Sequence, residues 1–371
     1  MKKITILALH LGFGGIEKYI SSLCKMLEEN YEIEIISTYK VLDKPAFEFS
    51  EKVNIQYLIN DKPYKKEMKD AFNEKRVLKG TNYFIKNLVL LNRRKKSNIK
   101  AIKNIDSDII ITTRDFHNRL VGKYAKKNIK KIATEHNYHN NDNKYIIKLV
   151  NSIRNFDYFV VVSNELKYFY KDKIGNTKCI FIPNVIDKVY DDPKYNKNHN
   201  LVSVGRLSSE KGFLDLLDII KIVAKTIPDV RLDLIGDGEQ KEILENKINF
   251  LDLKKNVIMH GFLNQDQIEK IIVNDSIYVM ASFTESFGLV LIEAMSYGLP
   301  CVAFDTASGA REIITNKDFL IKDRNNDEFA KFIIELFKNP SNIEKQGKAN
   351  YYYCRKYLLR NVKAEWQKLL K

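Results

Sequence analysis

The chain has 371 residues, of which 44% are apolar, and it carries a formal net charge of +15 at pH 7. A single hydrophobic core stops growing at about 250 to 300 residues, so this length predicts two domains. The four cysteines lack the spacing of metal ligands, which argues against structural zinc and predicts a reducing compartment. No run reaches the roughly 18 to 20 apolar residues that span a bilayer, so we expect a cytoplasmic protein.

The positive charge is confined to the first half of the chain. Residues 201–371 contain 24 basic and 24 acidic residues, so the whole excess lies in residues 1–200. It is densest in residues 62–103, where 14 basic residues accompany 3 acidic ones. Such a segment suits nucleic acid, anionic lipid headgroups or a pyrophosphate-linked acceptor, and it is equally consistent with a lysine-rich surface that binds none of them.

A glycine loop separates the first predicted strand, residues 3–9, from a helix that runs to about residue 29. The loop contains Gly12, Gly14 and Gly15, and a strand, glycine loop and helix in this order bring the backbone close to a phosphate. The dinucleotide fingerprint requires a third glycine where this chain has Glu17, so an NAD-dependent oxidoreductase is disfavoured.

Short apolar segments after this helix predict further strands of a parallel sheet. They are residues 31–37, 53–58, 108–112, 131–134, 157–163 and 179–183. His136 follows one of these strands, at the carboxyl end, where open α/β sheets bind ligands. A single histidine is more often structural, but this position makes His136 a candidate site residue.

The basic segment of residues 62–103 has a helical pattern and contains many apolar residues as well. Two interpretations remain open. The segment suits an amphipathic helix that lies on an anionic membrane surface. It also suits a helix that packs its apolar face on its own domain.

A polar stretch without apolar periodicity, residues 187–200, predicts a linker between the two domains. The second half then begins with a strand, residues 201–204, followed by Gly205, Arg206 and Lys211. If the end of this strand faces a ligand, the two cations converge on an anion. Residues 231–238 and 257–262 predict the next strands.

Residues 276–304 predict a strand, a short helix and a further strand. The start of the helix is marked by Ser286, which precedes an apolar run as its N-cap, and its end is marked by Gly298. Its first turn offers backbone N–H groups and the positive end of the helix dipole, and Gly288 lets a ligand approach the backbone. The sequence therefore predicts an anion site here, most naturally for a phosphate.

Two carboxylates, Glu285 and Glu293, belong to this predicted unit, with seven residues between them. Beside an anion, Glu285 is better suited to accept hydrogen bonds from hydroxyls than to bind a phosphate, because like charges repel. Glu293 lies on an apolar helix and suits the diol of a ribose. A phosphate flanked by two hydroxyl-rich groups describes a nucleotide sugar, whereas the alternative is that both glutamates are solvated surface charges.

These residues resemble the signature of family 4 glycosyltransferases, which are retaining enzymes of the GT-B fold that use nucleotide-sugar donors. The resemblance rests on Glu285, Ser286, Phe287, Gly288, Leu289, Glu293, Ala294, Met295, Gly298 and Pro300. It implies two Rossmann-like, doubly wound parallel-sheet domains that face a cleft. The chain departs from the family pattern at Val185, where the family has a glycine.

The resemblance also assigns roles to the candidate residues. Glu285 would contact hydroxyls of the donor sugar, Glu293 would hold the ribose, and His136 would contact the sugar near the reacting carbon. The predicted catalytic residues are therefore His136, Arg206, Lys211 and Glu285. The predicted donor-binding residues are Gly14, Gly15, Gly205, Arg206, Lys211, Gly261, Phe262, Glu285, Ser286, Phe287, Gly288, Leu289 and Glu293.

We expect an acceptor-binding domain in residues 1–186, a linker in 187–200, a nucleotide-sugar domain in 201–357, and a helix in 358–371 that returns to the first domain. The expected reaction transfers a hexosyl unit, with retention and without metal or cofactor, from a UDP-linked donor to a lipid-linked glycan. The product would be a surface polysaccharide, and residues 62–103 would contact the inner face of an anionic membrane.

Two alternatives remain besides the transferase. A nucleotide-sugar epimerase or hydrolase on the same fold would release product without an acceptor. A nucleic-acid-binding protein is suggested only by the high isoelectric point, and it is disfavoured because the basic excess is confined to one half and no basic motif contains stacking aromatics.

Overall fold

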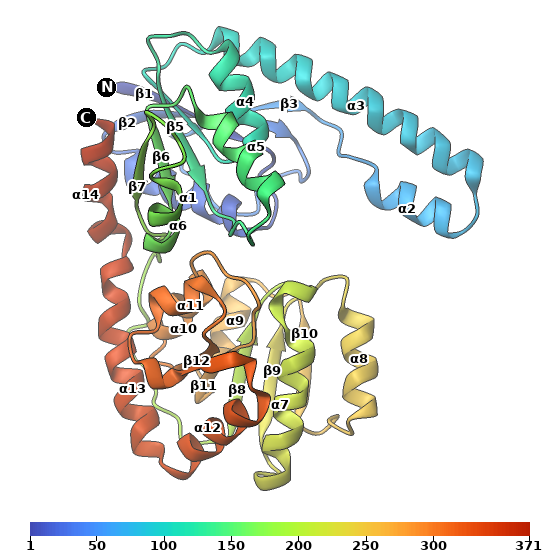
Figure 1. Ribbon diagram of the computed structural model, residues 1–371, viewed down its shortest axis with the longest axis vertical. Coiled ribbons are helices and arrows are strands. Elements are labelled where there is room, and N and C mark those ends of the chain that lie inside the picture. The colour runs from blue at the N-terminus through green and yellow to red at the C-terminus, as the bar shows by residue number, and fades with distance from the viewer. The chain divides into compact units, whose positions relative to one another are not determined.

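A computed structural model describes residues 1–371, except for the side chains of Lys65 and Lys66. The chain divides into two compact units, each built around one parallel sheet (Figure 1). The first unit comprises Met1–Val161, Leu166–Ile182 and Lys363–Lys371, and the second comprises Val162–Glu165 and Pro183–Val362. The two parallel α/β sheets confirm the predicted fold class.

The first unit contains a seven-stranded sheet with the strand order β3-β2-β1-β4-β5-β6-β7, in which all neighbours are parallel. Its strands are β1 (Lys2–Ala8), β2 (Tyr31–Tyr39), β3 (Asn54–Ile59), β4 (Ile109–Thr112), β5 (Lys130–Glu135), β6 (Tyr158–Val161) and β7 (Lys178–Phe181). The central strands β1 and β4 are apolar along nearly their whole length and buried, because helices cover both faces of a parallel sheet.

The helices of this unit follow the strands. They are α1 (Gly15–Leu27), α2 (Lys65–Asn73), α3 (Val77–Asn104), α4 (Asp115–Tyr124), α5 (Asn143–Ile153), α6 (Asn164–Tyr170) from Leu166 onward, and α14 (Leu359–Leu370) from Lys363 onward. The end of α14 is fixed by Trp366, which is fully buried, and by Gln367, whose amide donates to Asn30 at 2.9 Å. The last residues of the chain therefore complete the core of the first unit.

The second unit contains a six-stranded parallel sheet with the order β10-β9-β8-β11-β12-β13. Its strands are β8 (Asn200–Val204), β9 (Arg231–Ile235), β10 (Val257–Gly261), β11 (Ile277–Met280), β12 (Cys301–Phe304) and β13 (Leu320–Ile321). Its helices are α7 (Phe213–Thr226), α8 (Lys241–Phe250), α9 (Gln265–Ile272), α10 (Leu289–Ser296), α11 (Ser308–Ile313), α12 (Asn326–Lys338) and α13 (Pro340–Tyr353). Short 3-10 turns are η1 (Ser209–Lys211), η2 (Lys317–Phe319), η3 (Lys322–Arg324) and η4 (Cys354–Tyr357).

Each sheet has one point at which the strand order reverses. In the first unit it lies between β1 and β4, and in the second between β8 and β11. At such a point the loops that follow the two strands diverge to opposite faces of the sheet, and ligands of open α/β sheets bind beside the carboxyl ends of those strands. The topology thus marks one binding edge in each unit.

The predicted start of the helix after β11 is wrong by two residues. The N-cap is Gly288 rather than Ser286, and α10 begins at Leu289. Gly288 has a φ of 85°, a left-handed conformation that interrupts the helical path and that residues with a Cβ rarely adopt. Ser286 instead lies buried in the preceding loop.

The longest helix of the first unit, α3, forms a hairpin with α2 and extends away from the sheet of its own unit (Figure 1). Of the helices in residues 1–371 that the structure describes, none combines the length and the apolar character needed to cross a membrane.

Candidate functional site

The loops that follow β8 and β11 lie side by side at the reversal point of the second sheet. The first contains Gly205, directly after β8, and turns through η1 to Lys211. The second runs from the end of β11 to Gly288. They are joined where the backbone N–H of Phe283 donates to the carbonyl oxygen of Glu210 at 2.8 Å. Candidate residues that are about 75 positions apart in the sequence therefore share one edge.

Lys211 and Glu285 form an ion pair at this edge. The Lys211 Nζ lies 2.6 Å from Glu285 Oε2, and the two side chains are 21% and 19% exposed. A charge-assisted contact of this kind in a partly buried place is stronger than one on the open surface. The pair presents a cation suited to an anionic group and a carboxylate suited to accept hydrogen bonds from hydroxyls.

The N-terminus of α10 lies directly after the Glu285 loop. The helix opens with the apolar residues Leu289, Val290 and Leu291, so its positive dipole end and first N–H groups are not matched by a carboxylate of its own first turn. Glu293 lies one turn beyond Leu289 on the same helix and is half-buried. This geometry suits an anion at the helix start and a hydroxyl-bearing group beside Glu293.

α11 packs against the loop between Glu285 and Gly288 and holds its backbone. The backbone N–H of Gly309 donates to the carbonyl oxygen of Glu285 at 2.7 Å. A Cβ at residue 309 would lie 2.5 Å from the carbonyl carbon of Phe287, a distance that only glycine permits. Phe287 is 2% exposed and packs edge-on against Tyr357, with the ring centroids 5.6 Å apart. The backbone that carries Glu285 is therefore held on two sides.

Arg324 clamps the start of the same loop. Its guanidinium donates to the carbonyl oxygens of Ala281 at 2.9 Å and Ser282 at 3.1 Å, and it pairs with Asp215 at 2.5 Å. It also stacks on the ring of Phe283, with 3.6 Å between the guanidinium carbon and the ring centroid. The backbone of Arg324 is left-handed, with a φ of 50°, a strained conformation for a residue with a Cβ. Arg324 thus positions the loop without belonging to any sequence motif.

Arg206 takes a different partner from Lys211. Its guanidinium pairs with Glu210 at 2.8 Å, and its side chain is 69% exposed. The structure therefore brings Lys211 and Glu285 together, while Arg206 lies in the same loop with its charge directed to solvent. A long exposed arginine can turn toward an anion at little energetic cost.

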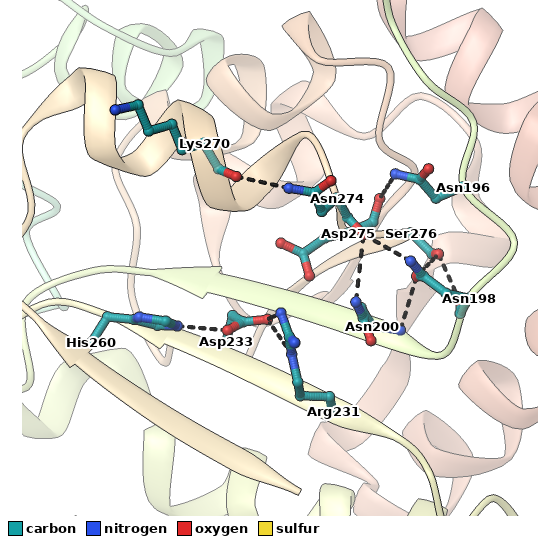
Figure 2. A network of polar contacts seen from close by, with 10 residues as sticks. All are labelled: Asn196, Asn198, Asn200, Arg231, Asp233, His260, Lys270, Asn274, Asp275 and Ser276. Carbon is teal, nitrogen blue, oxygen red and sulfur yellow. Dashed lines mark hydrogen bonds and ion pairs between the residues drawn. The ribbon is translucent and has the colours of Figure 1, made fainter.

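The predicted base-binding residues lie at the end of β10. Gly261 is the last residue of this strand, and the exposed fraction of Phe262 is 56%. The imidazole of His260 is held by Asp233, with 2.5 Å between Nε2 and Oδ1, and Asp233 is fully buried and also pairs with Arg231 at 2.6 Å (Figure 2). This network anchors β10, an edge strand of the sheet, at the residue before Gly261.

A second cluster of charges lies at the reversal point of the first sheet. Glu17 is 4% exposed, and its Oε1 lies 3.4 Å from Nη2 of Arg114 and 3.5 Å from Nδ1 of His10. Glu17 belongs to the first turn of α1, which is capped by Gly14 and begins at Gly15. A Cβ at residue 14 would lie 2.2 Å from the Glu17 carboxylate, so this carboxylate folds over the helix start. The Glu17 carboxylate thereby stabilises the positive dipole end of α1.

His136 lies beyond the end of β5 and is held by its neighbours. Its Nε2 is 3.0 Å from the Thr134 hydroxyl, and its ring centroid is 4.1 Å from that of Tyr19. Burial, followed by the nearby Arg114 charge, lowers the pKa of His136 to about 3. The imidazole is therefore neutral at physiological pH, and it can exchange hydrogen bonds with a hydroxyl but adds no positive charge.

In the part of the chain that the structure describes, no three His, Cys, Asp or Glu side chains gather in a way that could hold a metal ion.

The sequence matches two protein families that together cover most of the chain. Residues 13–189 match the family described as Glycosyltransferase Family 4, and residues 188–352 match the family described as Glycosyl transferases group 1. The chain belongs to the family 4 glycosyltransferases.

Curated relatives agree with this assignment, and a solved structure shares the fold. The glycosyltransferase is 28% identical to an uncharacterized glycosyltransferase of Haemophilus influenzae over the full length of both chains. It is 29% identical to the poly(glycerol-phosphate) alpha-glucosyltransferase of Bacillus subtilis over 63% of this chain, but it spans only 36% of that protein. A crystal structure of a TarM variant from S. aureus, in complex with UDP, alpha-GlcNAc-glycerol and fondaparinux, superposes with a TM-score of 0.79 at 15% identity over 100% of both chains. The shared architecture is that of a GT-B fold.

Some site residues of this glycosyltransferase gave no signal in the sequence. Arg324 stands among Lys322, Asp323 and two asparagines, a run that is typical of a solvated loop. Its role depends on a left-handed backbone, which composition does not reveal. Arg114 and His10 each follow a buried strand, so the rule that selected His136 would also have selected them, had it been applied to every strand end.

Proposed function

We propose that this glycosyltransferase moves a hexosyl unit from a UDP-linked sugar to a hydroxyl of a glycan acceptor, with retention at the anomeric carbon. The observation that carries the proposal is the Lys211–Glu285 pair beside the start of α10, whose first turn holds no carboxylate, at the reversal point of the second sheet. A cation, a helix N-terminus and a carboxylate together match a sugar joined to a diphosphate. The UDP in the complex of the TarM variant supports the choice of nucleotide.

In this proposal the donor diphosphate lies at the N-terminus of α10 and is bound by Lys211 and Arg206. Arg206 is exposed and free to swing, so it turns from Glu210 toward the phosphates when the donor binds. Glu285 accepts hydrogen bonds from the sugar hydroxyls, and Glu293 accepts them from the ribose. The base lies against the backbone of Gly261 and Phe262.

The chemical step breaks the bond between the anomeric carbon and the diphosphate oxygen and forms a bond from that carbon to the acceptor oxygen. Negative charge develops on the departing diphosphate, where Lys211, Arg206 and the α10 dipole stabilise it. The departing phosphate oxygen takes the proton of the acceptor hydroxyl on the same face of the sugar. That route retains the anomeric configuration and requires neither a protein nucleophile nor a metal. His136, as a neutral imidazole, is assigned to a sugar hydroxyl near the reacting carbon.

We further propose that the acceptor is a lipid-linked glycan of a surface polysaccharide and that the enzyme works at the inner face of an anionic membrane. The support is the confinement of excess positive charge to residues 1–200 and its maximum in residues 62–103. A basic segment of this kind is attracted to the anionic lipids of the cytoplasmic leaflet, where a lipid-linked acceptor would be held.

The test is a turnover assay in which UDP-sugars are supplied with and without acceptor glycans. The proposal expects UDP release to depend on the acceptor and the product to keep the anomeric configuration of the donor, as read from the NMR coupling of the anomeric proton. Equal sugar release in the absence of acceptor would establish a hydrolase instead. Conversion of one UDP-sugar into its epimer would establish an epimerase.

A further inference from the structure

The α2–α3 hairpin exposes an apolar face that a soluble helix would bury. Val77, Leu78, Phe84, Ile85, Leu88, Val89 and Leu91 of α3 are between 45% and 91% exposed. At 100° per residue these seven side chains fall within an arc of about 160° along roughly 21 Å of the helix. Thr81 and Asn92 also lie within this arc and are exposed. Scattered exposed apolar residues are ordinary, but seven that gather on one side of one helix mark an interaction surface.

The opposite side of α3 makes the contacts with the rest of the unit. Tyr83 stacks on Tyr64, with the ring centroids 5.8 Å apart, and the Asn87 side chain accepts from the backbone N–H of Tyr64 at 2.9 Å. Leu90 is 5% exposed and packs with Tyr39 and Ile59 in a small core. α3 therefore packs one side on its own unit, where Leu90 and Ile102 are buried, as one of the two interpretations of the sequence expected. The seven apolar side chains on the other side remain exposed.

Positive charge borders the exposed face. Lys79, Lys86 and Arg93 recur every seven residues, so they form one row along a margin of the apolar arc, and all three are exposed. Lys95 and Lys96 follow at the end of the apolar stretch and are exposed as well. Residues 77–104 contain no acidic residue, although Asp61, outside the helix, pairs with Arg93 at 3.0 Å. A wide apolar face with a cationic margin is the pattern of helices that lie in the interface of an anionic bilayer.

We infer that α3 inserts this apolar face into the headgroup region of an anionic bilayer, while its lysines contact lipid phosphates. The inference rests on the proposed function in one respect, because a lipid-linked acceptor gives this contact its purpose. Among possible occupants the charge selects the bilayer, since a second copy of this chain would bring an equal cationic margin against the first. The helix lies flat on the surface and does not span it.

The experiment measures cosedimentation of the full-length protein with vesicles of phosphatidylcholine containing about 30% phosphatidylglycerol. We expect binding that falls about tenfold or more with phosphatidylcholine alone, and that falls again when NaCl is raised from about 0.05 M to about 0.5 M. The triple variant Ile85→Ser, Leu88→Ser and Val89→Ser should lose about tenfold or more of the binding. All three side chains point away from the unit, so circular dichroism and the melting temperature should be unchanged.

A matched control removes exposed apolar side chains elsewhere. Ile243→Ser with Phe250→Ser changes two residues of α8 that are 53% and 87% exposed, and it should leave vesicle binding within about twofold. A spectroscopic arm uses Leu88→Trp. Trp366 is fully buried and is the single tryptophan of the chain, so a blue shift on adding vesicles would report insertion of the new indole.

The inference would be overturned if the wild-type protein did not bind anionic vesicles. It would also be overturned if the triple variant bound them as well as the wild type does. A dimer that dissociates in the triple variant, without vesicle binding, would assign the face to a second copy instead. Titration with UDP separates the two proposals. Lost vesicle binding with intact UDP binding would refute only the membrane surface, and the reverse outcome would refute only the transferase site.

Discussion

The reversal points of the two sheets carry opposite arrangements of the same charges. Between β8 and β11 the cation Lys211 follows the first strand and the carboxylate Glu285 follows the second, and both are about one-fifth exposed. Between β1 and β4 the carboxylate Glu17 follows the first strand and the cation Arg114 follows the second, and Glu17 is 4% exposed. Topology therefore fixes where polar groups gather, whereas burial decides whether they remain accessible to a ligand.

The two helix starts explain the difference in accessibility. Glu17 lies in the first turn of α1 and stabilises the positive dipole end from within the chain. The first turn of α10 contains only apolar residues, so an anionic ligand can bind at its positive end, where α1 has its own carboxylate. On this account the second edge binds the donor diphosphate, and the first edge is a structural cluster that shapes the surface around His136.

The largest expected effect comes from Lys211→Ala. It removes the cation proposed to stabilise the leaving diphosphate, and it leaves Glu285 without its partner next to an anion. We expect kcat to fall about 10²- to 10³-fold, as for the loss of one charge-stabilising donor. Steady-state kinetics with saturating donor measure it. The control is Lys247→Ala. It breaks a similar ion pair, 2.7 Å long, between Lys247 of α8 and Asp218 of α7, and it should keep wild-type turnover.

Glu17→Gln tests whether the first edge is structural. The amide keeps the shape but not the charge, so Arg114 loses its partner and stability should fall by about 1–3 kcal/mol. Urea unfolding measures this change. An unchanged stability, together with a loss of UDP affinity as large as that of Lys211→Ala, would show that Glu17 binds the ligand and is not a structural residue.

The pH dependence of stability provides a third test, through His136. Its folded pKa of about 3 lies below the ordinary value of 6.5, so below pH 6.5 the unfolded chain binds a proton that the folded chain does not. This contribution to stability is present above pH 6.5 and is lost progressively as the pH falls toward 3. It amounts to a loss of about 2 kcal/mol at pH 5. His136→Gln should make this part of the unfolding curve less steep but not flat, because burial also lowers the pKa of His117 to about 3. An unchanged slope would show that the His136 imidazole is already charged in the folded protein.

Arg324→Lys should have the smallest effect. Lysine can still pair with Asp215, but it cannot bridge the carbonyls of Ala281 and Ser282 at the same time. We expect UDP affinity to fall about tenfold through looser placement of the Glu285 loop, with little change in melting temperature. Partial recovery of affinity when guanidinium is added to Arg324→Ala would confirm positioning, and equal affinity in all variants would refute it.

The sequence predicted the parallel sheets because buried strands read as continuous apolar runs, and it predicted which loops meet because such strands end at the same edge. The sequence did not predict contacts that depend on the backbone conformation of single residues. The left-handed backbone at Gly288 shifts the start of α10, and that at Arg324 lets its guanidinium bind the carbonyl oxygens of Ala281 and Ser282. Neither conformation follows from local composition. The outward direction of the α3 stripe was also undetermined, since periodicity identifies a face but not what covers it.

The most direct test of the account is calorimetric titration of UDP, without added metal, into the wild-type protein and three variants. We predict that wild type and Glu17→Gln bind UDP with similar affinity, and that Lys211→Ala and Glu293→Ala bind UDP at least about tenfold more weakly. UDP binding that survives both substitutions in the second unit but is lost in Glu17→Gln would contradict it and move the donor to the first sheet.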